Sequence, residues 1–204
     1  MDSLPCRKRS LDPAKLIKAL EKALGPISAT RIAPWGTRVI VEVEQSRDLL
    51  RVARCLESGI EGGRWDWLDH LSAVHQPSGD LVFSAFIESR GLKSLGLVLR
   101  WHVHCGGSEE RVGATSLREI WSEALRLEYE IAALFGVTFR NEAGAVVETG
   151  ADFLPKGWVG FPLRKNYLPP MEFLDIAHSR SPGQTSPDEF GVVPEPILDG
   201  PGGW

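Results

Sequence analysis

Residues 81–88 read LVFSAFIE and residues 97–105 read LVLRWHVHC. Both runs are rich in β-branched and aromatic side chains and are bounded by Gly, Pro, Ser and Asp, which is typical of β-strands. An aromatic-rich run at 64–74 precedes them, and at 37–44 valines alternate with other residues in the pattern of a further strand. The sequence therefore predicts a small β-sheet in the middle of the chain.

Two shorter helices are predicted around the first of these strands. Asp12 is suited to cap the first helix, Pro13 suits its first turn, and Gly25-Pro26 ends it. The second helix is predicted at 46–58. The order helix, strand, helix and then three strands indicates an α+β fold, with the helices packed on one face of a small mixed or antiparallel sheet.

A longer helix is predicted from about residue 120, because an apolar stripe recurs there at helical spacing. Ser116-x-x-Glu119 has the pattern of a capping box, and Gly136 is well placed to end the helix. Glu128 and Glu130 are expected on the two shoulders of the stripe. The stripe consists of Ile120, Ala124, Leu127, Ile131 and Leu134.

Residues 157–167 read GWVGFPLRKNY, which suits neither a helix nor a central strand. Pro162 lacks an amide hydrogen and Gly160 tolerates backbone angles that a Cβ forbids. We expect an ordered, extended segment that presents Arg164 and Lys165 to carboxylates of a partner. On this basis Arg164→Glu is expected to weaken partner binding and leave the isolated fold intact. The residues alone leave docking and an ordinary exposed loop equally open.

These patterns divide the chain into four parts. Residues 1–10 are expected to be disordered, and 11–138 to form the α+β core domain. An extended docking segment is expected at 139–176. The tail at 177–204 is poor in apolar residues and is expected to wrap a partner or to be disordered.

Composition limits the functional classes. The net charge of -4 argues against nucleic-acid binding, which usually needs a basic face. No apolar run approaches the roughly 20 residues of a membrane-spanning helix. Cys6, Cys55 and Cys105 are widely spaced, which suits a reducing cytosol and predicts neither a disulfide framework nor an iron–sulfur cluster.

His102 and His104 are the weak candidates for a metal site, since alternate residues of a strand share one face. His70 and His75 are possible additional ligands, but no spacing identifies a third ligand. Polar residues on the exposed face of a sheet are the favoured interpretation.

Asp66, Asp69 and His70 lie near two tryptophans and are candidates for acid–base chemistry. No nucleophile motif accompanies them, so edge or turn residues are the favoured interpretation. The sequence therefore predicts no catalytic residues.

Residues 120–137, IWSEALRLEYEIAALFGV, resemble the helix of the C subunit of NADH–quinone oxidoreductase (respiratory complex I), whose pattern runs I-W-P-A-A-N-W-x-E-R-E-x-Y-D-L-F-G-I. Residues 154–167, LPKGWVGFPLRKNY, resemble the family pattern L-P-D-D-W-x-G-H-P-L-R-K-D-Y. Two matches in the same order are more specific than either alone.

The sequence also departs from the family pattern, which marks a divergent member. The loop at 140–152 lacks the expected G-H-P-D-L-R-R run. The departures include helix and segment positions at which the family has Pro, Asn, Trp, Arg, Tyr, Asp, His and Asp: Ser122, Leu125, Arg126, Tyr129, Ala132, Ala133, Phe161 and Asn166.

The resemblance implies a subunit of the hydrophilic arm that binds no cofactor of its own. Its implied partners are the large catalytic subunit and the iron–sulfur subunits, which carry the clusters and the quinone site. The implied location is peripheral, on the cytoplasmic side of the inner (cell) membrane, with membrane contact only through the assembled complex. Carried over by position, the helix motif is Glu128, Glu130, Leu134, Phe135 and Gly136, and the docking segment is Gly160, Pro162, Leu163, Arg164, Lys165 and Tyr167.

Two alternatives remain at this stage. The same type of subunit occurs in membrane-bound nickel–iron hydrogenases and formate hydrogenlyase-like complexes, where a nickel–iron centre lies in the partner. A free-standing metalloprotein that uses His102 and His104 is the more distant alternative.

Overall fold

The computed structural model describes residues 9–10, 12–25, 30–36, 38–60, 63–90, 92–93, 96–105, 111–148, 153–170, 172–173 and 176–177. The chain divides into two units, Met1–Tyr167 and Leu168–Trp204. In the described part of the second unit, β10 (Glu172–Phe173) pairs antiparallel with β11 (Ile176–Ala177). The expected disorder at 1–10 lies outside the described residues except at Arg9 and Ser10, which form the short strand β1. The expectation that 177–204 wraps a partner or is disordered lies outside them except at Ala177, which belongs to β11.

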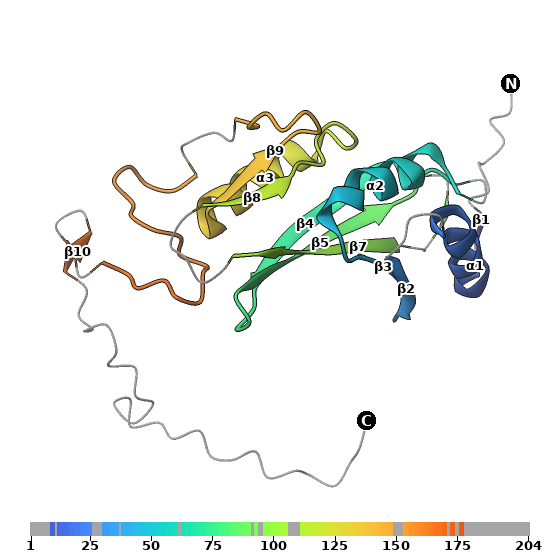
Figure 1. Cartoon of the computed structure of the whole chain (residues 1–204), viewed down its shortest axis with the longest axis horizontal. Helices are drawn as coiled ribbons and strands as arrows, with labels where there is room; N and C mark the ends of the chain where they lie inside the picture. The colour runs from blue at the N-terminus through green and yellow to red at the C-terminus, as the bar shows by residue number, and fades with distance from the viewer. Residues whose placement is uncertain are drawn as a thin grey trace, which may run out of the picture. The chain divides into compact units, whose positions relative to one another are not determined.

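A five-stranded mixed sheet forms the centre of the first unit (Figure 1). Its strand order is β2-β3-β7-β5-β4, and only β3 and β7 run parallel. The strands are β2 (Thr30–Trp35), β3 (Arg38–Val43), β4 (Trp67–His75), β5 (Asp80–Glu88) and β7 (Gly96–His104). The predicted mixed sheet is thereby confirmed.

Helices α1 (Pro13–Leu24) and α2 (Leu49–Ser58) pack against one face of this sheet. Asp12 caps α1 as predicted, because its Oδ1 accepts the N–H of Ala14 at 3.1 Å. A short 3-10 turn, η1 (Ser46–Asp48), leads into α2. The core between the helices and the sheet includes Leu16, Leu20, Val41, Val52, Leu56, Phe83, Leu99 and Trp101.

The alternating burial of side chains along β5 shows which face of the sheet packs against the core. Leu81, Phe83, Ala85 and Ile87 are buried in the core, whereas the residues between them are half-buried. Since successive side chains of a strand point to opposite faces, one face of β5 packs under the helices. The α+β fold predicted from the sequence is confirmed.

The remaining elements extend this core. Strand β8 (Val112–Thr115) and β9 (Val137–Arg140) pair in parallel, and α3 (Ala124–Phe135) connects them. A short parallel ladder joins β1 (Arg9–Ser10) to β6 (Leu92–Lys93). After β9 the chain turns at 141–144, and Arg140 pairs with Val146 to form a short hairpin.

Helix α3 begins later than the sequence predicts. The predicted start was near Ile120, but residues 118–123 form turns and the helix begins at Ala124. Ser116 does not form a capping box, because its hydroxyl donates instead to the Glu128 carboxylate at 2.8 Å. Gly136 ends the helix as predicted, in the left-handed conformation with φ 66°.

Candidate functional site

Within the segment expected at 139–176, residues 153–167 have no regular secondary structure but are fixed to the end of α3, and from here on the name docking segment means Phe153 to Tyr167 alone. The N–H of Leu163 donates to the carbonyl of Leu134 at 3.1 Å. The Phe161 ring fills the space that a Cβ on Gly136 would need. A helix end leaves carbonyls without intrahelical donors, so this segment supplies contacts that α3 lacks.

Arg164 is the central attachment of the docking segment. Its side chain lies inside the first unit, and the residue is only 5% exposed. Nε donates to the carbonyl of Phe135 at 2.7 Å and Nη2 to that of Gly136 at 3.3 Å. The guanidinium also stacks over the Phe161 ring, 4.8 Å from its centroid. A cation that bonds the last carbonyls of a helix stabilises its negative end.

This position corrects an expectation from the sequence. Arg164 was expected to present its charge to a partner, but the structure buries the charge against α3. The expectation that Arg164→Glu leaves the isolated fold intact therefore does not stand. Of the two adjacent cations, Lys165 is the exposed one.

A second attachment joins the docking segment to the sheet. The backbone N–H of Lys165 donates to Nδ1 of His75, the last residue of β4, at 3.0 Å. Further along, the Trp158 and Tyr167 rings stack with centroids 6.4 Å apart. Gly160 adopts φ 81° and allows the Tyr167 ring to approach its backbone closely. The attachments to α3 and β4 described here thus lie between Phe161 and Lys165, and the Trp158–Tyr167 stack joins two parts of the segment itself.

The docking segment also exposes large apolar side chains. Val159 is 73% exposed and Leu163 is 51% exposed, and Phe153 is exposed to a similar degree. Lys156 and Lys165 are exposed on the same stretch of chain. Single exposed apolar residues are common on protein surfaces, and these three lie within one segment of 15 residues.

The contact between Gly136 and Phe161 is testable. Replacing Gly136 by alanine is expected to lower the free energy of unfolding by about 2 kcal/mol, because a Cβ is strained at positive φ and overlaps the Phe161 ring. Chemical denaturation measures the change.

Gly144→Ala is the matched control. Gly144 also has positive φ (80°), but nothing lies within 4 Å of its Cβ position. The Gly144→Ala variant therefore introduces backbone strain without a steric overlap. An equal loss of unfolding free energy in the two variants would contradict a role for the Phe161 contact.

Glu128 is buried completely, at 0% exposure, and not at the shoulder of α3 where the sequence placed it. Its Oε1 accepts the N–H of Leu117 at 2.7 Å, and its Oε2 accepts the Ser116 hydroxyl. Burial raises the pKa of this carboxyl to about 7, against the lowering effect of those two hydrogen bonds. Glu128 therefore ties the chain before α3 to the helix. Glu130 is exposed.

The candidate metal ligands each pair with a carboxylate on a neighbouring strand. Nε2 of His102 lies 3.2 Å from Glu42 Oε1, and Nδ1 of His104 lies 2.7 Å from Asp80 Oδ1. In the part of the chain that the structure describes, no group of three His, Cys, Asp or Glu residues is placed to hold a metal ion. Each of these histidines is thus within hydrogen-bond distance of a carboxylate on the exposed face of the sheet.

The acid–base candidates also separate. Asp66 accepts hydrogen bonds from the backbone N–H and the Nε of Arg90, at 3.2 and 3.0 Å. Asp69 instead lies where the pairing of β4 with β5 shifts register. His70 contacts the Phe86 ring with centroids 6.0 Å apart. The structure does not bring the three side chains together as one reaction centre.

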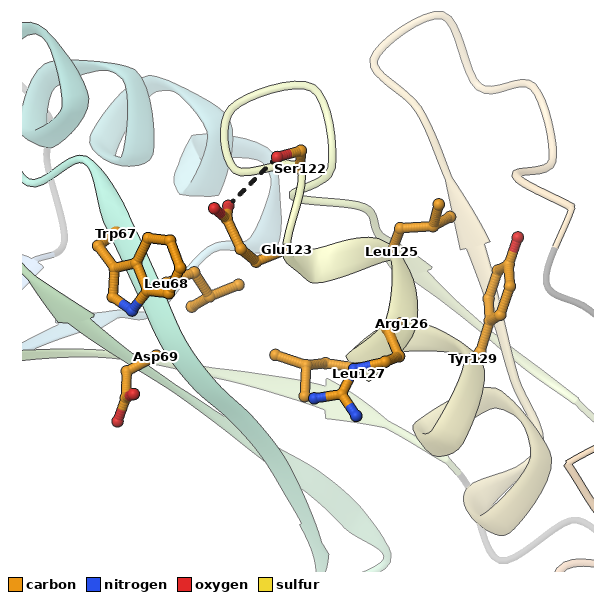
Figure 2. Close-up of a pocket in the computed structure, with 9 residues that line it drawn as sticks. All are labelled: Trp67, Leu68, Asp69, Ser122, Glu123, Leu125, Arg126, Leu127 and Tyr129. Atoms are coloured by element: carbon orange, nitrogen blue, oxygen red, sulfur yellow. Dashed lines mark hydrogen bonds between the residues drawn. The ribbon is translucent and has the colours of Figure 1, made fainter.

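An open groove of about 440 Å³ lies between β4 and the start of α3 (Figure 2). Figure 2 shows Arg126 and Leu127 pointing from α3 toward β4. Ser122 donates a long hydrogen bond, 3.4 Å, to Glu123. The groove is lined by Trp67, Leu68, Asp69, Ser122, Glu123, Leu125, Arg126, Leu127 and Tyr129.

Residues 41–172 match the family model of the respiratory-chain NADH dehydrogenase 30 Kd subunit. The match includes α3, Glu128 and the docking segment with its anchor Arg164. The chain belongs to this family. The resemblance to this type of complex I subunit, seen in the sequence, is thereby confirmed.

Two solved structures are similar to parts of this chain. A chain of the membrane-bound sulfane sulfur reductase, an archaeal respiratory membrane complex, is similar at TM-score 0.53 and 14% identity, over 69% of this chain and 76% of that one. A trypsin-resistant fragment (1-134) of Nqo5 is similar at TM-score 0.47 and 17% identity, over 65% of this chain and 99% of that one. No curated protein sequence matches the chain. Among the described residues, no helix is long and apolar enough to cross a bilayer.

Several residues that differ from the family pattern line the groove of this 30 Kd-type subunit. Ser122, Leu125, Arg126 and Tyr129 all line it, at positions where the family pattern has Pro, Asn, Trp and Arg. At another departure, Phe161, the guanidinium groups of Arg111 and Arg164 lie over the ring, 5.3 and 4.8 Å from its centroid. Four of the named departures therefore lie together at this groove.

Sequence reasoning missed the internal partners of this site. The burial of Arg164 and Glu128 follows from contacts between parts of the chain far apart in sequence. His75 was weighed as a metal ligand, whereas it accepts a hydrogen bond from the docking segment. Nothing local to His75 in the sequence indicates that contact.

Proposed function

We propose that this chain is a structural subunit in the hydrophilic arm of a complex I-type NADH–quinone oxidoreductase and docks onto the large catalytic subunit. The family match over residues 41–172 carries the proposal. The chain supports electron transfer to quinone, coupled to ion translocation, by holding other subunits in place. It binds no cofactor itself, and iron–sulfur clusters and quinone belong to its partners.

The exposed side of the docking segment supports this role. Val159 and Leu163 offer apolar area to a partner, and Lys165 offers a charge beside it. A segment already held by Arg164 loses little conformational entropy on binding. Its partner is therefore expected to present an apolar surface with carboxylates at the rim.

The proposed location is peripheral, on the cytoplasmic side of the inner (cell) membrane, with the membrane reached only through the assembled complex. Purification of the tagged chain from its native membranes tests the whole proposal. Recovery with the large catalytic and iron–sulfur subunits is expected, with iron and no nickel in the complex. Nickel in the purified complex would indicate that the assembly is a hydrogenase and not a quinone-reducing complex. Recovery of the chain alone would refute docking.

Leu163→Asp is expected to weaken association with the large catalytic subunit about tenfold or more, because a carboxylate would have to be desolvated in an apolar contact. Co-purification at graded partner concentration measures the change. Since Leu163 is half exposed, the melting temperature should stay close to that of the unmodified chain.

Val146→Asp serves as the control for this prediction. Val146 is exposed to a similar extent, at 55%, but lies in the hairpin after β9 and outside the docking segment. If both substitutions weakened association with the large catalytic subunit equally, a specific role of Leu163 in that contact would be contradicted.

A further inference from the structure

We propose that His75 is a proton-sensitive fastener of the docking segment: its neutral imidazole holds the backbone of Lys165, and its protonation releases that part of the segment. The link from this release to partner binding rests on the proposed docking function. The fastener itself is a property of this chain alone. His75 acts as a positioning residue, because it sets the segment in place and need not touch the partner.

The hydrogen bond at His75 defines which form of the ring can hold the segment. The N–H of Lys165 lies 3.0 Å from Nδ1, and a backbone N–H can only donate. Nδ1 must therefore carry a lone pair, and the proton of the neutral ring must be on Nε2. Protonating Nδ1 places two N–H groups against each other and breaks the contact.

Burial makes the charged ring costly at this position. His75 is 5% exposed, and its buried Nε2 has no hydrogen-bond partner among the residues that the structure describes. An imidazolium would present two donors here with no acceptor for either.

The neighbouring charges act in both directions. Arg164 and Lys165 on the docking segment add positive charge near the ring, and the Asp80 carboxylate of β5 opposes them. The Asp80 carboxylate is already bonded to His104 and to the Ser78 hydroxyl. The Cys105 thiol, whose pKa is raised by burial, is neutral. Burial first, and then the two cations, lower the pKa of His75.

The sign of the pH effect follows from that direction. The released ring titrates near its ordinary value of about 6.5, whereas the fastened ring stays neutral to lower pH. Below that value release takes up a proton, so the equilibrium for fastening falls about tenfold per pH unit until the lowered pKa is reached. Leu163 and Arg164 stay attached to α3, because their acceptors are carbonyls that do not titrate.

Amide hydrogen exchange on the full chain tests the fastener. Protection of the Lys165 amide, corrected for intrinsic exchange, is expected to fall about tenfold per pH unit below pH ~6.5. The Leu163 amide, bonded to a carbonyl, is the internal reference and should keep its protection. His75→Asn places an amide oxygen near the position of Nδ1 and should make Lys165 protection independent of pH. His70→Asn, on an exposed histidine of the same strand, should behave like the unmodified chain.

Parallel loss of protection at Lys165 and Leu163, or the same pH profile in His75→Asn as in the unmodified chain, would overturn the proposal. Association with the large catalytic subunit is then compared at pH 7.5 and 5.5. Weakening at the lower pH in the unmodified chain, and not in His75→Asn, supports the link to docking. If exchange shows the switch but association ignores it, the fastener stands and the link to docking fails.

Discussion

Arg164→Glu is expected to destabilise the isolated chain by about 3–5 kcal/mol, one of the two largest effects foreseen for this protein. The substitution removes the donors to the Phe135 and Gly136 carbonyls at the end of α3. It also places a buried carboxylate against those carbonyls, so the loss exceeds that of a missing cap. Urea denaturation measures it directly.

Lys165→Glu provides the matched comparison for Arg164→Glu. It makes the same change of charge one residue further along, on an exposed side chain, and should cost less than about half a kcal/mol. A stable Arg164→Glu variant would contradict the capping role and return Arg164 to the surface. Loss of partner binding by Arg164→Glu alone would not distinguish the two roles, because unfolding also abolishes binding.

The second large effect is a dependence of stability on pH through Glu128. Its pKa rises from 4.5 to about 7 on folding, because burial disfavours the charged carboxylate. The protonated form is therefore the one that folding favours. The contribution of protonated Glu128 to the free energy of unfolding is complete below pH 4.5 and is lost as pH rises through about 7. At about 1.36 kcal/mol per pKa unit, the loss amounts to about 3 kcal/mol.

Glu128→Gln isolates this contribution. A glutamine side chain can accept from the Leu117 N–H and donate to the Ser116 oxygen, and it does not titrate. The difference in unfolding free energy between variant and unmodified chain should grow in favour of the variant from pH 4.5 to 8. Taking the difference removes the opposite contribution of His75, which is common to both proteins. A difference that does not change with pH would show that Glu128 is ionised at little cost.

The strands and short helices were predictable because their signals are local. The β-branched and aromatic runs of β5 and β7 and the cap at Asp12 are features of neighbouring residues in the sequence, and each element appears where expected. Glu128 shows the opposite case. Its position on α3 was predictable, but its burial depends on Ser116 and Leu117, which fold back over the helix.

Arg164 illustrates the same limit at the candidate site. Its rigid Gly- and Pro-containing surroundings indicated an ordered segment, and the structure has one. Whether the guanidinium points to a partner or to the chain's own helix depends on the acceptors of α3, 28 and 29 positions earlier. Strand β2 was missed for a local reason, because Pro34 and Gly36 interrupt its pattern.

The parallel pairing of β3 with β7 has a consequence for how the protein folds. Arg38 pairs with Gly96, 58 positions later, so this contact closes a long loop that contains α2 and the β4–β5 hairpin. Closing such a loop costs entropy before it brings any stabilising contact, and folding rates fall as contacts become more distant in sequence. The hairpin, by contrast, closes over a few residues. We therefore expect the β4–β5 hairpin to form early and the β3–β7 pairing to limit the folding rate. Until β3 and β7 pair, their unpaired edges can form intermolecular contacts that lead to aggregation.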